Sequence, residues 1–242
     1  MKILLQCQSK PAVHFNGKWC SMLVLLLLTA NFLLAQSPNE VITSVNNRFS
    51  KVNDYTANVN VSCNISFIKI EPINAKVFYK RPDKFRVKST GILILPKQNA
   101  NFYFTALADT NSFTAVKTGE EMIGGVQVQV INVIPSADTS DLILGKFWID
   151  NVKGLVLKSQ LTTKSQGTIL VENIYGSMKE YALPDKMLFT VDVGKFKIPK
   201  ALAADLNHTA NNKTSQGDNK GRITLTFSGY AVNKGVSNDV FK

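Results

Sequence analysis

The chain has 242 residues and a formal net charge of +11, from 28 lysines and arginines against 17 aspartates and glutamates. A hydrophobic content of 45% is enough to fill the core of one sizeable domain. Only two histidines are present, His14 and His208, which argues against metal sites built on several imidazoles.

The N-terminal residues have the composition of an export signal. Residues 1–18 hold three lysines and no acidic residue, and residues 21–35 hold no charge. This pattern, with a small residue at position 35, predicts a signal peptide over residues 1–35. An uncleaved anchor is the alternative, but the apolar run is shorter than the roughly 20 residues that a membrane span needs. We therefore expect an exported, soluble protein with a single domain over residues 36–242 that, without the three lysines, carries a charge of +8.

Few residues of this domain suit catalysis. His208 is its only histidine and Cys63 its only cysteine, so a His-based triad and an intrachain disulfide are excluded. Cys63 lies on the apolar parity of a predicted strand and is expected to be a small core residue. We expect no cofactor, no metal site and no enzyme activity; a hydrolase of the cell envelope is the remote alternative.

The domain begins with a predicted helix over residues 38–53. Ser37 and Glu40 have the spacing of a capping box, with Pro38 at the first helical position. Apolar residues then recur at helical spacing, which makes one face of this helix apolar. These residues are Ile42, Val45, Phe49 and Val52.

From Tyr55 the apolar residues alternate with polar ones as far as Phe67, which predicts a long strand with one buried face. The alternation changes phase at Phe67–Ile68 and again near Val130–Ile131, and each change suggests a β-bulge. Turn signals separate the later strands, including a type I turn at residues 81–84 and a hairpin loop at residues 150–154. These strands are expected near residues 75–79, 85–87, 101–108, 112–117, 125–134, 146–150, 154–163, 168–175, 186–193 and 222–232.

The predicted fold class is mainly β (α+β), with a large antiparallel meander behind one helix. Residues 199–207 form a candidate short helix, and residues 208–221 are polar and aperiodic, which is typical of a mobile loop.

Residues 77–89 carry five cationic side chains with aromatic residues between them. Such a hairpin is able to stack and neutralise RNA, but export and strand parity favour a solvated outer face, and we expect no nucleic-acid partner. That interpretation covers Lys80, Arg86 and Lys88, together with Lys76 just before this stretch. It leaves Arg81, in the turn before Pro82, unexplained.

The sequence resembles the outer-membrane lipoprotein-sorting family of LolA/LolB-like periplasmic carriers. The similar segments are the helix followed by Asp-Tyr-Thr-Ala at residues 54–57, Lys-Arg-Pro-Asp-Lys-Phe-Arg at residues 80–86, and Phe-Trp-Ile-Asp at residues 147–150. Leu183-Pro184 and the tail from Tyr230 fit as well. The region of residues 93–118 matches the family pattern poorly.

The resemblance implies an unclosed half-barrel whose concave apolar face is covered by an N-terminal amphipathic helix and short helices that act as a lid. Lipid acyl chains or lipoprotein cargo then occupy the cavity, with transient contact to membrane-bound donor and acceptor proteins. It implies that Arg81 holds the lid through backbone carbonyls. The expected cavity lining is Val59, Val61, Phe67, Val77, Tyr79, Phe102 and Phe104.

Two alternatives remain at this stage. The fold also suits a periplasmic sensor or chaperone that binds a protein partner or another hydrophobic ligand. Periodicity alone does not distinguish a ligand cavity from an ordinary filled core. The charge of +8 favours anionic lipid headgroups or acidic partner proteins, or serves solubility alone.

Overall fold

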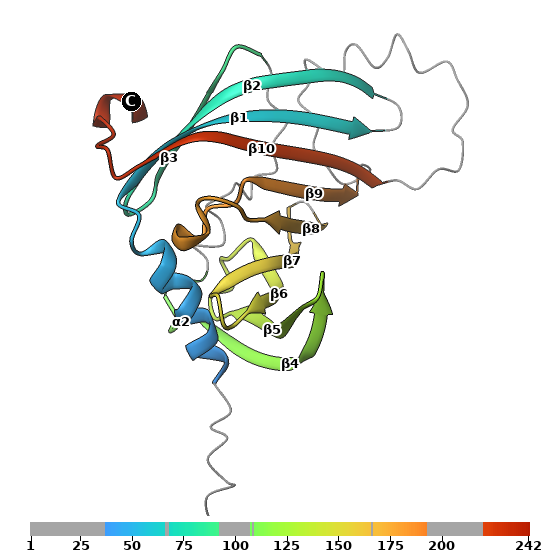
Figure 1. The fold of residues 1–242 in the computed structure, drawn as a ribbon. Coiled ribbons are helices and arrows are strands. Elements are labelled where there is room, and N and C mark those ends of the chain that lie inside the picture. The colour runs from blue at the N-terminus through green and yellow to red at the C-terminus, as the bar shows by residue number, and fades with distance from the viewer. Residues whose placement is uncertain (1–36, 66–67, 92–106, 108, 166, 193–219) are drawn as a thin grey trace, which may run out of the picture. The chain divides into compact units, whose positions relative to one another are not determined.

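The computed structural model describes residues 37–65, 68–91, 107, 109–165, 167–192 and 220–242. In this part of the chain, ten strands form one antiparallel sheet in the order β3-β2-β1-β10-β9-β8-β7-β6-β5-β4 (Figure 1). The strands are β1 (Asp54–Ile65), β2 (Ile68–Lys80), β3 (Lys84–Ser89), β4 (Phe113–Ile123), β5 (Val126–Pro135), β6 (Leu142–Asp150), β7 (Leu155–Thr163), β8 (Gly167–Ile174), β9 (Lys186–Asp192) and β10 (Lys220–Val232).

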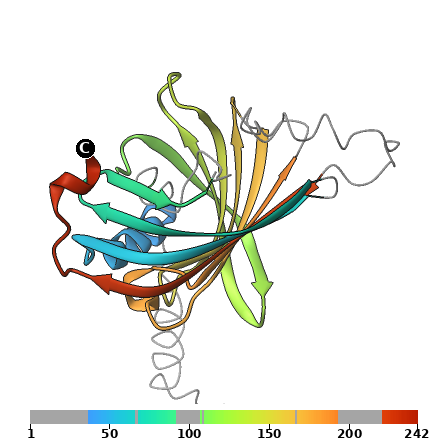
Figure 2. The ribbon, with the colours of Figure 1, turned by 90° about the horizontal axis from the view of Figure 1, so that it is seen from above.

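The order of the strands shows how the sheet is assembled. Neighbours in the sheet are consecutive strands of the chain except for the pair of β1 and β10. The C-terminal strand therefore joins the first three strands to the other six. The edge strands β3 and β4 are not paired with each other, so the curved sheet is an unclosed half-barrel (Figure 2). The predicted mainly β fold class is confirmed.

The helix α2 (Pro38–Phe49) begins with the predicted capping box. The Ser37 hydroxyl accepts a hydrogen bond from the Glu40 N–H at 3.2 Å, and the Glu40 carboxylate accepts one from the Ser37 N–H at 3.0 Å. The prediction that this helix reaches residue 53 is wrong, because it ends at Phe49 with Ser50 as its C-cap. The Asn53 N–H instead donates to the Asn233 side chain, which leads the backbone away from the helix and into β1.

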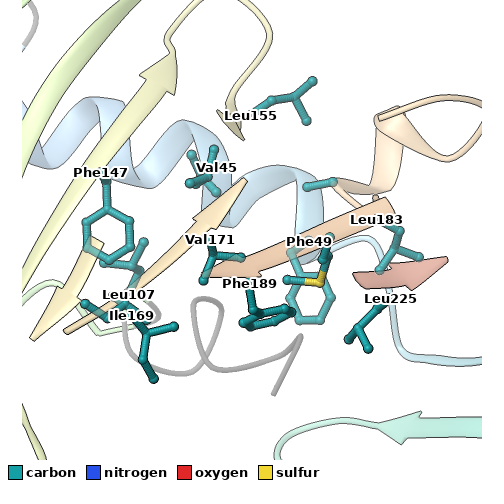
Figure 3. Packing of buried hydrophobic residues seen from close by; sticks show 14 of the residues in the cluster. Val45, Phe49, Leu107, Phe147, Leu155, Ile169, Val171, Leu183, Phe189 and Leu225 are labelled. Atoms are coloured by element: carbon teal, nitrogen blue, oxygen red, sulfur yellow. The ribbon is translucent and has the colours of Figure 1, made fainter. Parts of the chain in front are cut away.

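The helix packs its apolar stripe onto one face of the sheet, here called the inner face; the opposite face is the outer face. Val41, Ile42, Val45 and Phe49 of α2 are buried. Figure 3 shows Val45 and Phe49 among side chains of β8, β9 and β10. This apolar core continues along the inner face on every strand except β3, whose apolar residues are half-buried. The buried residues of the core include Tyr55, Val59, Val61, Val77, Phe113, Ile131, Phe147, Leu161, Ile169, Val171, Phe189, Ile223 and Leu225.

A second, smaller apolar cluster lies on the outer face. It is built on Val128, Val130 and Trp148, and Lys146 and Lys158 place their ammonium groups 4.7 and 4.6 Å from the Trp148 ring centroid. This cluster explains the phase change that suggested a bulge in β5, because β5 is apolar on both faces. The extra residue is in β4 instead, since the register passes from Lys117–Ile131 to Gly119–Val130. The predicted β5 bulge is therefore wrong.

Several predicted features fall outside the described residues. They are the bulge at residue 67, the strand at residues 101–108 apart from Leu107, the short helix at residues 199–207 and most of the loop at residues 208–221. The last two residues of that loop belong to β10, which begins at Lys220. Among the described residues, no helix combines the length and apolarity needed to cross a membrane.

Candidate functional site

The C-terminal end of α2 is bonded to the turn between β2 and β3. Arg81 Nη1 donates to the Ser50 carbonyl at 3.0 Å, and the Arg81 N–H donates to the Asn53 carbonyl at 2.9 Å. The last carbonyls of a helix have no intrahelical partner, so a guanidinium is well suited to this position. The Arg81–Pro82 peptide bond, at the start of the predicted turn, is cis.

Asn233 holds the same connection from the other side. Its Nδ2 donates to the Lys51 carbonyl at 2.8 Å, and its Oδ1 accepts from the Asn53 N–H at 2.7 Å. Asn233 has a φ of +57°, a left-handed conformation that asparagine tolerates better than most residues. The sequence reasoning missed this residue, although an asparagine directly after a strand and two residues before a glycine was the available signal.

Further contacts fix the middle of α2. Asn46 Nδ2 donates to the Leu107 carbonyl at 2.5 Å. Gly154, in the hairpin loop between β6 and β7, has a φ of +57°, and a Cβ atom there would lie 2.8 Å from the Ser44 carbonyl oxygen. Only glycine allows this loop to approach the helix backbone so closely.

Beneath the C-terminal half of α2 lies a group of aromatic rings. Phe49 and Tyr79 have ring centroids 5.3 Å apart, Tyr55 and Tyr79 are 5.4 Å apart, and Tyr55 and Tyr230 are 5.8 Å apart. Burial raises the pKa of Tyr55 and Tyr230 well above the usual value, and it also raises the pKa of Tyr79. Their hydroxyl groups are therefore neutral, and that of Tyr230 donates to the Pro184 carbonyl at 2.8 Å. The inner face beneath the helix is uncharged and largely apolar.

Four of the seven predicted cavity residues are described, and all four are buried on the inner face: Val59, Val61, Val77 and Tyr79. The other three, Phe67, Phe102 and Phe104, lie outside the described residues. Two grooves are lined by described residues, and most of their lining side chains point to the outer face. The first, of about 580 Å³, is polar and borders Asn58, Asn74, Lys76 and Lys88. A cavity on the inner face therefore stays a prediction.

The basic hairpin of residues 77–89 largely contacts the C-terminal tail. Lys80 Nζ donates to the Val236 carbonyl at 2.8 Å, Lys84 Nζ donates to the Asn238 side chain at 3.2 Å, and Arg86 donates to the Lys242 carbonyl. The interpretation of Lys80 and Arg86 as a solvated face is wrong, because both hold the tail backbone.

Lys76 and Lys88 do lie exposed on the outer face. Their ammonium groups are 5.6 and 5.7 Å from the Phe78 ring centroid. The six cations of residues 76–89 thus have three tasks: Arg81 contacts the helix end, Lys80, Lys84 and Arg86 hold the tail, and Lys76 and Lys88 pack over the Phe78 ring.

The described residues hold little that suits catalysis. Cys63 is half-buried against the core, and burial raises the pKa of its thiol to about 11, so the nucleophilic thiolate is scarce at neutral pH. No group of three or more histidine, cysteine or acidic side chains in this part of the chain is arranged to hold a metal ion.

No family model matches the chain, and no curated protein matches it. Solved structures do. A LolA superfamily protein from Nitrosomonas europaea is 11% identical, with a TM-score of 0.54 over 86% of this chain and 98% of that one. An outer membrane lipoprotein-sorting protein domain from Vibrio parahaemolyticus is 13% identical, with a TM-score of 0.52 over 85% of this chain and 96% of the domain.

A DUF1329 family protein from Desulfovibrio piger is 11% identical, with a TM-score of 0.50 over 86% of this chain and 98% of that one. Identities this low carry information on the fold and not on cargo or partners. The fold of this chain is therefore similar to that of a LolA superfamily protein and of an outer membrane lipoprotein-sorting protein domain.

Proposed function

We propose that this protein is a periplasmic carrier that binds the acyl chains of a lipid or lipoprotein on its inner face, beneath α2, and that it serves outer-membrane lipoprotein sorting without catalysis. The observation that carries the proposal is the combination of an inner face that is apolar from strand to strand with one amphipathic helix lying on it. Acyl chains need an apolar surface shielded from water, and this arrangement provides one.

In this proposal α2 is the lid and Arg81 is the lid contact. The side chains that face α2 are buried, so a chain enters only when the helix moves away from them. The contacts at the C-terminal end of α2 are polar and exposed, namely those of Arg81 and Asn233. Exposed polar contacts cost less free energy to break than a buried apolar interface. This difference supports a lid that releases these contacts and opens while the backbone still connects it to β1.

Export and partners belong to the same proposal. A signal peptide over residues 1–35 delivers the domain of residues 36–242 to the periplasm, and its charge of +8 favours contact with anionic headgroups or acidic donor and acceptor proteins. Sedimentation with anionic and neutral vesicles tests the electrostatic part. We expect binding to anionic vesicles at low salt that disappears at high salt; equal binding to both vesicle types would refute it.

The carrier proposal itself is tested by what the protein holds. The exported protein is purified without detergent, extracted with organic solvent, and the extract is analysed by mass spectrometry. A matched control is an unrelated exported protein purified in the same way. We expect acyl-chain lipids in stoichiometric amounts in the first extract only. Lipid-free protein that also fails to take up a fluorescent acylated peptide would favour the protein-binding sensor or chaperone instead.

A further inference from the structure

The positive charge of the sheet is concentrated in one half of it. Strands β10, β1, β2 and β3 together contain eight lysines and arginines and only two acidic residues, Asp54 and Glu71. The other six strands contain four lysines and five acidic residues. The charges of many side chains add to one potential, so an anion is attracted to the first half of the sheet.

A row of polar side chains crosses this half of the sheet on its outer face. The strand register places Ser228 beside Asn58, Asn58 beside Lys76, and Lys76 beside Lys88. All four residues are exposed, and they have the opposite parity to the buried residues of the inner face. One ligand is therefore able to contact side chains from four neighbouring strands.

The two lysines of this row have no acidic partner. Lys76 and Lys88 lie directly opposite each other on β2 and β3, and like charges in this position repel each other. Neither forms an ion pair with a carboxylate of the described residues. Their ammonium groups lie over the Phe78 ring instead, and such a contact is weak at an exposed position. An anion that binds both ammonium groups would offset their repulsion.

The other end of the row lies at a β-bulge in β10. The register passes from Thr56–Ala231 to Asn58–Ser228, so β10 has one more residue here than β1. Gly229, in this bulge, has a φ of +61°, and a Cβ atom on it would lie 3.2 Å from Asn58 Nδ2. The absence of a side chain at Gly229 therefore leaves room for the Asn58 amide, an uncharged donor.

A groove of about 580 Å³ contains all four residues of the row, and we call it the basic groove. Its volume is within the range of about 300–1,000 Å³ that small-molecule sites occupy. Its lining has these two lysines, three asparagines, three hydroxyl side chains and no acidic residue. Asn60 Nδ2 donates to Asn74 Oδ1 at 2.8 Å, which leaves the Asn74 NH2 group as a further donor. The groove therefore offers positive charge and neutral donors without any negative charge.

We propose that the basic groove binds a phosphate monoester group, carried by a lipid headgroup or by a soluble molecule. A phosphate monoester has a charge of about −1.5 to −2 at pH 7 and three strong acceptor oxygens. These match two ammonium groups flanked by neutral donors. A carboxylate has one charge and two oxygens, so it uses fewer of these donors. The basic groove is on the outer face and is separate from the proposed carrier site beneath α2.

The test has two arms, one for each source of the phosphate group. In the first, the exported protein is titrated in a calorimeter with glycerol 3-phosphate and with glycerate, a carboxylate of similar size. In the second, it is sedimented with phosphatidylcholine vesicles with and without phosphatidic acid. We expect glycerol 3-phosphate to bind at least fivefold more tightly than glycerate if the molecule is soluble, and phosphatidic acid to be required for sedimentation if it is a lipid.

Two pairs of variants separate the groove from the overall charge. Asn58→Asp places a carboxylate in the groove, and Asn64→Asp is its control at an exposed position of the same strand and face outside the groove. Lys76→Gln removes a cation from the groove, and Arg222→Gln removes an exposed cation of β10 outside it. We expect each groove variant to weaken phosphate binding at least fivefold and each control to weaken it less than twofold.

Three results would overturn the site. They are no phosphate-dependent binding in either arm, equal or tighter binding of glycerate in the first arm without phosphatidic acid dependence in the second, and equal effects of the groove variants and their controls. None of these results bears on the carrier proposal, which is tested by the binding of acyl chains and not of phosphate groups.

Discussion

Replacement of Arg81 by leucine tests the proposed lid most specifically. The substitution removes the hydrogen bond from the guanidinium to the Ser50 carbonyl at 3.0 Å and leaves the backbone bond from the Arg81 N–H to Asn53. Arg81 is exposed, so water replaces part of the lost bond, and the expected loss is about 1 kcal/mol. If that bond stabilises only the closed lid, the closed state loses about fivefold in population relative to the open one.

The assay is release of a fluorescent acylated peptide from the preloaded protein, followed by stopped-flow fluorescence. Lys88→Leu is the control, because it removes a cation from the same hairpin that lies over the Phe78 ring and not at the helix end. We expect about fivefold faster release from Arg81→Leu and an unchanged rate from Lys88→Leu. Equal release rates in the two variants would mean that Arg81 is not the lid contact.

Three further predictions concern the framework around the helix and the core. Gly154→Ala adds a Cβ atom against the α2 backbone at a positive φ, whereas its control Gly124→Ala has a similar φ of +56° with nothing within 4 Å. In urea unfolding we expect Gly124→Ala to lose about 1 kcal/mol of stability from backbone strain alone and Gly154→Ala to lose clearly more. Equal losses would show that the loop does not contact the helix. Asn233→Ala removes bonds on both sides of the α2–β1 connection and is expected to cost about 1–2 kcal/mol; an unchanged melting temperature would contradict this. Cys63, with a pKa of about 11, should react with iodoacetamide at pH 8 at least tenfold more slowly than a free cysteine peptide, and a matching rate would refute its half-buried placement.

Much of the fold was predictable because alternation and turn residues are local signals. The capping box at Ser37 fixed the start of α2, and the hairpin loop after Asp150 was placed correctly. The end of α2 was not predictable in the same way, since Val52 continues the apolar helical spacing. After Phe49 the chain leaves the helix, and the Asn53 N–H donates to the side chain of Asn233, which is distant in sequence.

The prediction of a bulge in β5 was wrong for a related reason. Alternation predicts one buried face, but Val128 and Val130 pack on the outer face with Trp148 while Ile131 packs on the inner face. A strand that is apolar on both faces has the same sequence pattern of apolar residues as a strand whose alternation changes phase at a bulge. Similarly, the contacts of Lys80 and Arg86 with the tail depend on β10 lying beside β1, a pairing that local sequence does not specify.

The candidate site was predictable only in part. Strand parity placed Val59, Val61, Val77 and Tyr79 on the inner face, where the structure has them. The position of Arg81 next to a helix end came from the family resemblance and not from periodicity. Whether the inner face encloses space for a ligand depends on the packing of side chains from many strands, which no sequence pattern encodes.

The central claim is that acyl chains bind on the inner face, and paramagnetic relaxation measures this directly. Isoleucine methyl groups are labelled and their NMR signals recorded with a fatty acid that carries a spin label near the end of its chain. Ile169 and Ile223 are buried on the inner face, and Ile143 is exposed and outside the core cluster. The account predicts strong broadening of the Ile169 and Ile223 signals with the Ile143 signal unaffected; broadening of Ile143 alone, or of none of the three, would contradict it.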